Sequence, residues 1–470
     1  MTRRRPKGDS DPPAMPPPTG SESDRAPARS SLAGRTRALA EWHTLREVLI
    51  HRPGIEMFFG LMEPFSFLYE RAFRIEEATR EHATLEQALR DDGVTVRRLI
   101  HLAIEVGARR PEFLQKVRDQ VPSIVRYSGP RSMVERARTA LHQNLDKFDD
   151  ETLFNILLLR PSVRLARHPG ERGILPTVEL HTPLANLCFL RDQQALTANG
   201  YILGRMSKPQ RREEPALTGA LLRTWGADVV AEILSPGTFE GGDFLPMGEF
   251  ALLGTGDRTN ASAVRQILGA PIGFEEIAVV QQPSHPAVPG DDPDPMIDMH
   301  LDTYVNVPGS GLAVGCAPLL DRARTRTYRR NGRGTMVPEP KTASLREFLL
   351  GKKFRIVEIT TLEQMSYASN FLCLSDRKIL AVEVERQVDR VIATLGRAAN
   401  ENPHRYRALL SLVRKERERL REERRFFPHT RSLRDVGVEA IPLSLEEITG
   451  GYGGAHCLTC AVRRAPPAND

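Results

Sequence analysis

The sequence predicts a mixed α/β fold made of about five similar repeats, each a strand-turn-strand unit followed by a helix. Strand-turn-strand patterns recur at residues 186–203, 240–254, 300–315 and 370–384. The apolar run that begins at Leu45 opens a fifth unit. Helical patterns lie between the units, among them 217–224, 261–268 and 345–350. Because repeats of this kind cannot bury an apolar face alone, they favour a closed, pseudo-symmetric array.

The composition is that of an ordinary globular protein. The 470 residues are 40% hydrophobic and 27% charged, enough for about three domains or one large α/β domain with insertions. The net charge of +6 is small for this length and does not indicate nucleic-acid binding. The uncharged run 303–320 contains proline and glycine and is not a membrane helix, and no apolar segment follows the N-terminal arginines. We therefore expect a cytoplasmic protein without a nucleic-acid or membrane partner.

The pattern along the chain divides it into an arm, a folded domain and two insertions. Residues 1–37 are predicted to be a disordered, Pro/Arg-rich arm, because their first 31 positions hold no aromatic or branched aliphatic residue. Residues 38–470 form the folded domain. A helical insertion is expected at 104–160, where the pattern is helical throughout and lacks strands. A second is expected at 386–427, and its charged stretch 414–425 favours a solvated helix held by ion pairs.

Five short segments combine polar residues with strand ends or glycine turns. They are 186–192, 239–243, 256–259, 299–303 and 453–457. Any one of them alone is more often a turn than a site. Together they supply a cysteine nucleophile, a histidine and at least three carboxylates, which is the inventory of nucleophilic catalysis on a cationic substrate.

Cys457 is the candidate nucleophile. A thiol needs a lowered pKa or a nearby base to attack at neutral pH. The glycines at 450–454 around Tyr452 predict a flexible, open approach to it. Paired carboxylates can hold a planar guanidinium by parallel hydrogen bonds, so a guanidino compound fits this set of residues.

The other cysteines and two histidines have structural interpretations. Five scattered cysteines do not make a disulfide framework, and Cys460 is expected to be a bystander because no second cysteine pair accompanies it and Cys457. Three cysteines in apolar strands are expected in the core, namely Cys188, Cys316 and Cys373. His181 and His456 lack ligand-spaced partners and are expected at the surface or behind the site. No metal site is predicted.

In this order the motifs resemble those of arginine deiminase, in the guanidino-group-modifying (pentein or amidinotransferase) superfamily. The resemblance extends over about residues 41–465, from the opening strand at 45–54, through Glu81-His82, to the C-terminal Gly-Gly-Ala-His-Cys. It implies a pentein-type α/β propeller of about five pseudo-symmetric repeats with an inserted helical subdomain. Residues 38–470 would then be a catalytic propeller domain.

The resemblance implies a role for each matching residue. Cys457 would be the nucleophile and His300 the general acid and base, with Asp192 and Asp302 clamping the guanidinium and Glu240 supporting His300. The residues implied to bind the substrate are Asn186, Arg211, Arg258 and Asp243. Cys457 would expel ammonia from L-arginine, and water activated by His300 would hydrolyse the thiouronium intermediate to citrulline. No metal or organic cofactor is implied.

Two departures from the family pattern lie near the expected substrate entrance. Tyr452 stands where the family often has arginine, and Glu70-Arg71 stands where it often has an acidic pair. The reaction class is therefore better defined than the substrate, a small guanidino compound. An amidinotransferase, in which an amine resolves the Cys457 adduct, and an arginine dihydrolase are alternatives. A non-catalytic binding protein that keeps the pocket is a third, and a homo-oligomer is left open.

Overall fold

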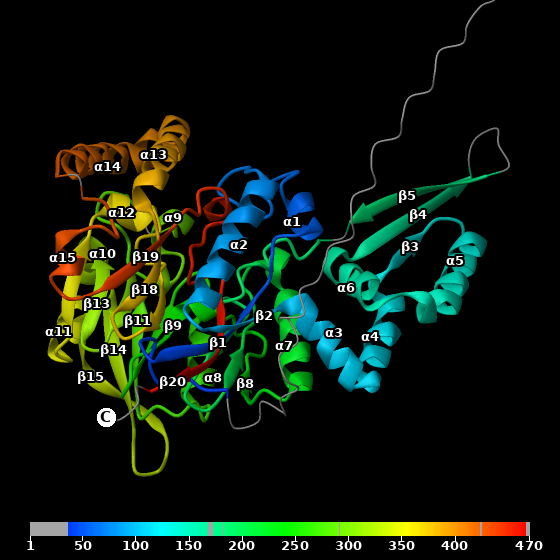
Figure 1. Cartoon of the computed structure of the whole chain (residues 1–470), viewed down its shortest axis with the longest axis horizontal. Helices are drawn as coiled ribbons and strands as arrows, with labels where there is room; N and C mark the ends of the chain where they lie inside the picture. Colours follow the sequence, from blue (N-terminus) through cyan, green and yellow to red (C-terminus); the bar gives the residue numbers. More distant parts are fainter. Residues whose placement is uncertain (1–35, 168–172, 181, 291, 424, 467–470) are drawn as a thin grey trace, which may run out of the picture. The chain divides into compact units, whose positions relative to one another are not determined.

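The computed structural model describes residues 36–167, 173–180, 182–290, 292–423 and 425–466 (Figure 1). Within the unit Leu32–Asp470, helices and strands alternate along the chain, which confirms the mixed α/β class. The predicted arm lies outside the described residues apart from its last two positions. His181 also lies outside them.

Five small sheets in the described chain repeat one pattern of strands. In each, two strands pair antiparallel and a third lies parallel to the second. Four sheets follow one another along the chain: β6 (Gln194–Leu196), β7 (Tyr201–Leu203) and β8 (Val229–Glu232); β9 (Phe244–Pro246), β10 (Ala251–Thr255) and β11 (Glu276–Gln281); β12 (Val305–Gly309), β13 (Leu312–Cys316) and β16 (Arg355–Ile359); β17 (Leu372–Ser375), β18 (Lys378–Val382) and β19 (Glu439–Leu443). The fifth joins the chain ends: β20 (Cys460–Ala465), β1 (Thr44–Ile50) and β2 (Thr95–Arg98).

A helix precedes the third strand of every repeat, because a parallel pairing needs a crossover connection. These helices are α2 (Ile75–Asp91), α7 (Glu214–Trp225), α8 (Ala261–Leu268), α11 (Leu345–Gly351) and α13 (Val384–Glu401). The five expected units are therefore present, and each continues after its helix with a third strand. These third strands are four to six residues long, too short for a clear alternation of apolar and polar positions.

Shorter elements connect the repeats. The helical ones are α1 (Ile55–Gly60), η3 (Pro209–Arg211), η4 (Gly241–Asp243), α9 (Pro295–Asp298), η5 (Leu301–Thr303), α10 (Ala317–Arg322), α12 (Thr361–Met365), α15 (Arg431–Arg434) and η6 (Ile448–Gly451). Two further strands, β14 (Arg324–Arg330) and β15 (Met336–Ser344), extend the second sheet beyond β11.

The apolar cores join neighbouring sheets. Leu49 of β1, Leu203 of β7 and Leu380 of β18 belong to one buried cluster, so sheets that are distant in the sequence share a core. A second cluster joins β11, β13 and β18, and a third joins β7 and β10. Each of these clusters contains residues of more than one repeat, as expected for interdependent units.

The first insertion contains strands as well as helices. Its helical elements are α3 (Leu99–Arg109), α4 (Pro111–Ile124), α5 (Arg131–Asn144), η2 (Leu145–Lys147) and α6 (Asp150–Leu159). Its strands are β3 (Arg126–Ser128), β4 (Pro161–Arg167) and β5 (Ile174–Leu180), which form one sheet. The expectation of 104–160 without strands was therefore wrong, because β3 has only three residues and pairs with a strand beyond that segment.

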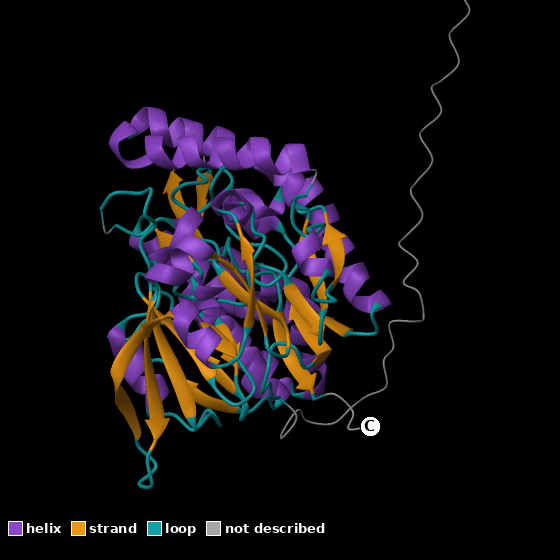
Figure 2. Ribbon diagram, turned by 90° about the vertical axis from the view of Figure 1, so that its left-hand side faces the viewer, coloured by secondary structure: helices purple, strands orange, loops and turns teal. Residues whose placement is uncertain are grey.

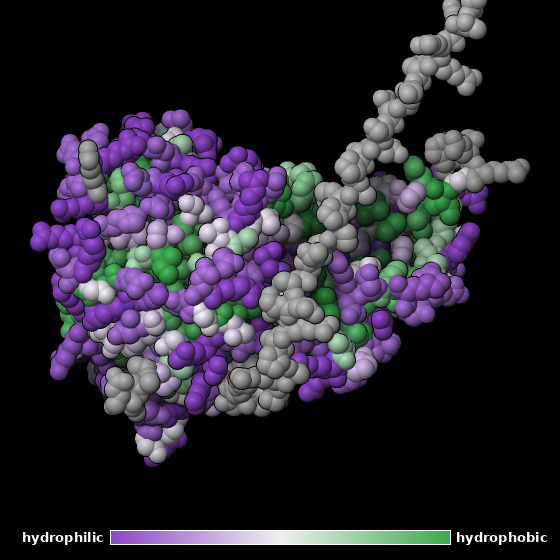
Figure 3. All heavy atoms as spheres, in the orientation of Figure 1, coloured by the Kyte–Doolittle hydropathy of each residue, from purple (hydrophilic) through white to green (hydrophobic). Residues whose placement is uncertain are grey.

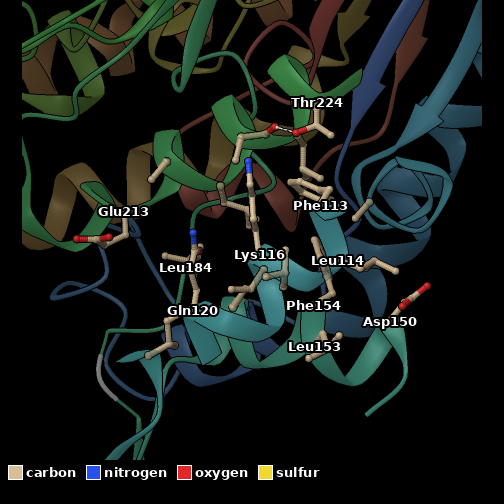
Figure 4. A pocket seen from close by; sticks show the side chains of 18 of the residues that line it. Phe113, Leu114, Lys116, Gln120, Asp150, Leu153, Phe154, Leu184, Glu213 and Thr224 are labelled. Carbon is tan, nitrogen blue, oxygen red and sulfur yellow. Dashed lines mark hydrogen bonds between the residues drawn. The ribbon is translucent and has the colours of Figure 1, made fainter. Parts of the chain in front are cut away.

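One cavity lies between this insertion and α7 (Figure 4). It encloses about 640 Å³ and is lined mainly by apolar side chains, including Phe113, Leu114 and Phe154. None of the residues proposed for catalysis lines it. The chemistry therefore has to be sought in another cavity.

The second insertion is a helical layer formed by α13 and α14 (Pro403–Glu423), which lies across the sheets in Figure 2. Leu395 of α13 and Val413 of α14 are buried, and Arg417 forms an ion pair with Asp389. Hydrophilic side chains dominate the surface of this region (Figure 3), which agrees with a solvated helix face. Across the described residues, every helix is too short or too polar to cross a membrane.

A buried ion cluster connects the two chain ends. Glu41, before β1, pairs with Arg464 of β20 at 2.9 Å and with Arg191, before β6, at 3.2 Å. All three side chains are at most 5% exposed. Burial raises the pKa of Glu41, but the two guanidinium groups outweigh this and hold it well below its ordinary value. Glu41 therefore stays ionised where the first and last strands meet.

We predict that Glu41→Gln destabilises the fold by about 3–5 kcal/mol, because it leaves two buried guanidinium groups without a counter-charge. Chemical unfolding at pH 7 measures the change. Glu135→Gln is the matched control, since Glu135 pairs with Arg131 on the surface of α5 and should leave stability unchanged within error. Equal effects of the two substitutions would contradict the prediction.

Candidate active site

Cys457 lies in a turn between η6 and β20 and is 3% exposed. Asn370 holds it in place: its Nδ2 donates to Sγ at 3.2 Å, and its Oδ1 accepts from the backbone N–H groups of Gly454 and Cys457 at 2.8 and 3.2 Å. Sequence reasoning missed Asn370. It precedes the first strand of its repeat, as His300 and Glu240 precede theirs, and that shared position is the signal that could have found it.

His300 is held between two carboxylates. Its Nε2 lies 2.9 Å from Glu240 Oε2, and its Nδ1 lies 3.7 Å from Asp192 Oδ1. All three side chains are buried. Burial lowers the pKa of His300, but Asp192 and the hydrogen bond with Glu240 outweigh it and raise the pKa to about 9. His300 is therefore an imidazolium at neutral pH.

Asp302 lies between Cys457 and a second histidine. One carboxylate oxygen, Oδ2, lies 3.7 Å from Cys457 Sγ and 2.7 Å from Nδ1 of His456. His456 is fully buried and lies behind the site, one of the two places expected for it. Its contact with Asp302 was not foreseen, because nothing in the sequence indicates which carboxylate a lone histidine contacts.

The electrostatics of the site favour a protonated thiol. Burial and then the negative charges of Asp302 and Asp192 raise the pKa of Cys457 well above its ordinary value. Burial also raises the pKa of Asp302, but the hydrogen bond with His456 outweighs it and the net pKa is lowered. The resting pair is thus a Cys457 thiol beside carboxylates, with the His300 imidazolium nearby. A cation bound next to Sγ would reverse this preference and favour the thiolate.

Two buried arginines balance the acidic groups. Arg211 pairs with Asp192 at 2.6 Å and with Glu214 at 2.9 Å. Arg258 lies 3.5 Å from Glu240. These contacts keep both guanidinium groups fixed at the wall of the site.

Six of the nine residues proposed from the sequence line one cavity, and three do not. The six are Asn186, Asp192, Arg211, Arg258, His300 and Cys457. Glu240 and Asp302 contact His300 and Cys457 from behind. Asp243 accepts a hydrogen bond from the backbone of Leu301 at 3.1 Å, and burial raises its pKa to about 6. Asp243 therefore supports the turn after His300 and does not line the cavity.

The cavity is narrow. It encloses about 20 Å³, close to the space one water molecule needs. Gly451 and Gly453 pack against Phe189, and a Cβ on Gly453 would lie 2.7 Å from that ring. The expectation of an open approach to Cys457 was therefore wrong: these glycines serve close packing, and Tyr452 covers the cavity in a left-handed conformation with φ +67°.

Several buried polar atoms at the site have no hydrogen-bond partner within the described chain. They are Asp192 Oδ1, His300 Nδ1 and Asp302 Oδ1. Leaving such atoms unpaired is costly, so they indicate a ligand. Two acceptor oxygens beside a thiol call for a cation with several N–H donors, as a guanidinium has.

One group of described residues has the spacing of a metal site, namely Asp192, Glu240 and His300. Both carboxylates already pair with buried arginines, and the raised pKa of His300 keeps a proton on its ring. This charge balance favours the protonated imidazole over a bound cation.

The five cysteines are free and buried, and Cys188 lies in a turn, not in a strand as expected.

The fold and this site define a hydrolase that acts on carbon-nitrogen bonds of amidines. The family model described as arginine deiminase matches residues 65–464, and the chain belongs to that family.

Two curated relatives of the chain are also arginine deiminases. Arginine deiminase of Halobacterium salinarum is 25% identical over 94% of this chain and all of the relative. That of Streptococcus agalactiae is 31% identical over 48% of this chain and 57% of the relative. Among solved structures, an amidinotransferase of Microseira wollei is 14% identical, with a TM-score of 0.49 over 93% of this chain and 99% of that one. DDAH from Pseudomonas aeruginosa is also 14% identical, with a TM-score of 0.45 over 88% and 98%.

The raised pKa of His300 predicts a pH-dependent stability. Its folded pKa of about 9 exceeds the ordinary 6.5, so the stabilisation is complete below pH 6.5 and is lost as the pH rises through 9. We expect protonation of His300 to make the free energy of unfolding roughly 3 kcal/mol larger below pH 6.5 than well above pH 9. Unfolding free energies at pH 6 and pH 10 should show the loss in the natural protein and not in His300→Gln. His404→Gln, at an exposed histidine of α14, should keep the natural pH dependence. The same loss in His300→Gln would contradict the assignment.

Proposed function

We propose that this protein hydrolyses L-arginine to L-citrulline and ammonia through a covalent thiouronium on Cys457. The observation that carries the proposal is the narrow cavity lined by the Cys457 thiol, the His300 imidazolium and the Asp192 carboxylate, with the Asp302 carboxylate 3.7 Å from the thiol. Membership of the arginine deiminase family supports the choice of arginine.

The substrate guanidinium binds between Asp192 and Asp302 in this proposal. Its N–H groups satisfy the free Oδ1 atoms of both residues, so the plane of the cation faces Cys457 Sγ. Asn186, Arg211 and Arg258 line the same cavity and bind the α-carboxylate end. Arg211 shares its charge with Asp192 and Glu214, and this rigid pairing keeps it oriented for a carboxylate.

The first half-reaction forms the adduct. The bound cation lowers the pKa of Cys457, and the thiol proton leaves to solvent. The thiolate attacks the guanidinium carbon and forms a C–S bond. His300 donates its proton to a terminal nitrogen, the C–N bond breaks and ammonia leaves. His300 is then neutral, and a thiouronium cation is bound to Cys457.

The second half-reaction uses water. Neutral His300 takes a proton from a water molecule as its oxygen attacks the thiouronium carbon. The tetrahedral species expels the sulfur, and its remaining hydroxyl proton goes to the thiolate. Citrulline leaves, and the thiol and imidazolium are restored. The sum is one arginine cation and one water converted to citrulline, ammonia and a proton.

The five repeats support a closed propeller. Elements of consecutive repeats contact one another in sequence, from β6 with η4 and β9 with η5 to β12 with β17 and β17 with β1. The ring is completed by the contact of β20 with β6. In this arrangement residues 38–470 form the catalytic domain, and the segments 104–160 and 386–427 are insertions in it.

Product analysis tests the reaction and its nucleophile. The purified protein with arginine should give equal amounts of citrulline and ammonia without an added amine, because water resolves the adduct. Cys457→Ala should abolish turnover. Cys460→Ala is the matched control and should retain it, since its Sγ lies against Tyr201 and not at the cavity. A requirement for an acceptor amine would favour an amidinotransferase, and release of ornithine would favour a dihydrolase. Failure to turn over any guanidine would favour a binding protein.

Asn370 is proposed to position the nucleophile. Asn370→Ala removes the donor to Sγ and the acceptor for the turn, so we expect kcat to fall by about 100-fold with KM changed less than threefold. Steady-state kinetics measures both constants. Asn306→Ala is an informative comparison, because the Asn306 side chain bonds to backbone groups of Ser369, Phe371 and Val307 and not to Cys457. A loss carried by KM alone would contradict the positioning role.

A further inference from the structure

A second cavity lies on the other side of Tyr452. This outer chamber encloses about 210 Å³ and is bounded by α9, α12, α13 and α14 together with Glu70 and Tyr452. Tyr452 lines both this chamber and the catalytic cavity, so it is their common wall. The second helical insertion therefore builds a compartment next to the catalytic cavity.

The inner wall of the outer chamber is acidic. Glu70 is 2% exposed, and its Oε2 accepts from Arg71 at 2.9 Å and from the hydroxyl of Tyr367 at 3.1 Å. Its Oε1 is buried and has no hydrogen-bond partner among the residues described. Asp294, also buried, lines the same chamber and accepts from the hydroxyl of Tyr406 at 2.8 Å.

A structural role accounts for only one of the two carboxylate oxygens of Glu70. Arg71 and Tyr367 fasten it to the loop before Cys457, since they also bond to the backbone oxygens of Glu446 and Thr449 at 2.6 and 2.9 Å. Both of these side chains contact Glu70 through its Oε2 atom. Oε1 is left as a buried acceptor on a residue that lines the outer chamber, which is costly unless a ligand supplies the donor.

Arg71 pairs with Glu70 at 2.9 Å and balances one of the two carboxylates at this end of the chamber. Arg397 of α13 is the one basic residue among its described lining residues, and it lies on the same helix as the exposed Glu401. Glu70 and Asp294 remain at the buried end. A cation with N–H donors therefore fits this end better than an anion or an apolar group.

We propose that the outer chamber is a capture site, in which Glu70 binds the guanidinium of arginine before it passes Tyr452 into the catalytic cavity. This inference rests on the proposed function and names the route of its substrate. The catalytic cavity has no room for arginine while Tyr452 covers it, so Tyr452 must move for each substrate. The ureido group of citrulline is uncharged and binds a carboxylate more weakly, so the chamber does not retain the product.

The test compares Glu70→Gln with two controls. Glu70→Gln keeps the shape and removes the charge, and we expect it to lower kcat/KM for arginine about tenfold with kcat within twofold. Tyr367→Phe removes a neighbouring hydrogen bond and keeps the charge, and Glu112→Gln removes an exposed charge on α4. Both should stay within twofold of the natural protein. An unchanged kcat/KM in Glu70→Gln, or an equal loss in Tyr367→Phe, overturns the proposal.

A measurement without turnover separates this inference from the proposed function. In a Cys457→Ala background, stopped-flow fluorescence gives the association rate constant of arginine. Adding Glu70→Gln should lower that constant about tenfold, and an equal rate overturns the capture site. If the natural protein makes no citrulline, the proposed function fails, and the association rates still decide whether Glu70 captures the cation.

Discussion

Buried charge at the centre of the molecule is the constraint on which the rest of the structure depends. Carboxylates, guanidinium groups and imidazoles meet there out of contact with water, and each must find a partner of opposite charge. Arg211 pairs with Asp192, and Arg258 pairs with Glu240. Glu41 pairs with both Arg191 and Arg464. Asp192 Oδ1 and His300 Nδ1 have no partner among the described residues, and both residues line the cavity. The pairing of buried charges that stabilises the fold therefore also determines what the site can bind.

The repeated architecture explains how side chains from distant parts of the sequence meet. The segments at 186–192, 240–243, 300–302, 370 and 457 each lie shortly before the first strand of a repeat. Because the repeats share cores with their neighbours, these equivalent segments are brought to one place. Each repeat then contributes one chemical function: an acid, an acid beside a histidine, an amide or a thiol.

The sequence predicted best those site residues that belong to recognisable motifs. It predicted least well those features that depend on how side chains pack in the fold. Cys457, His300 and Asp192 stood out because their motifs together supply a thiol, an imidazole and a carboxylate in an order that resembles arginine deiminase, whereas Asn370 is an ordinary turn residue whose role appears only through its distance to Sγ. Strand β3 was missed because three residues carry too little periodicity. The glycine-rich loop was misjudged because composition does not distinguish glycine needed for flexibility from glycine needed for contact with Phe189.

The narrowness of the catalytic cavity has a chemical consequence beyond access. A thiol enclosed with carboxylates is protonated and therefore a poor nucleophile until a cation replaces the missing counter-charge. The same cation completes the hydrogen bonds of Asp192 and Asp302. Binding and activation are thus one electrostatic event, and a neutral ligand of equal shape would leave the thiol inactive. In the proposed reaction, Tyr452 adds no charge to the wall of the cavity, so the bound substrate supplies the further positive charge that favours the Cys457 thiolate.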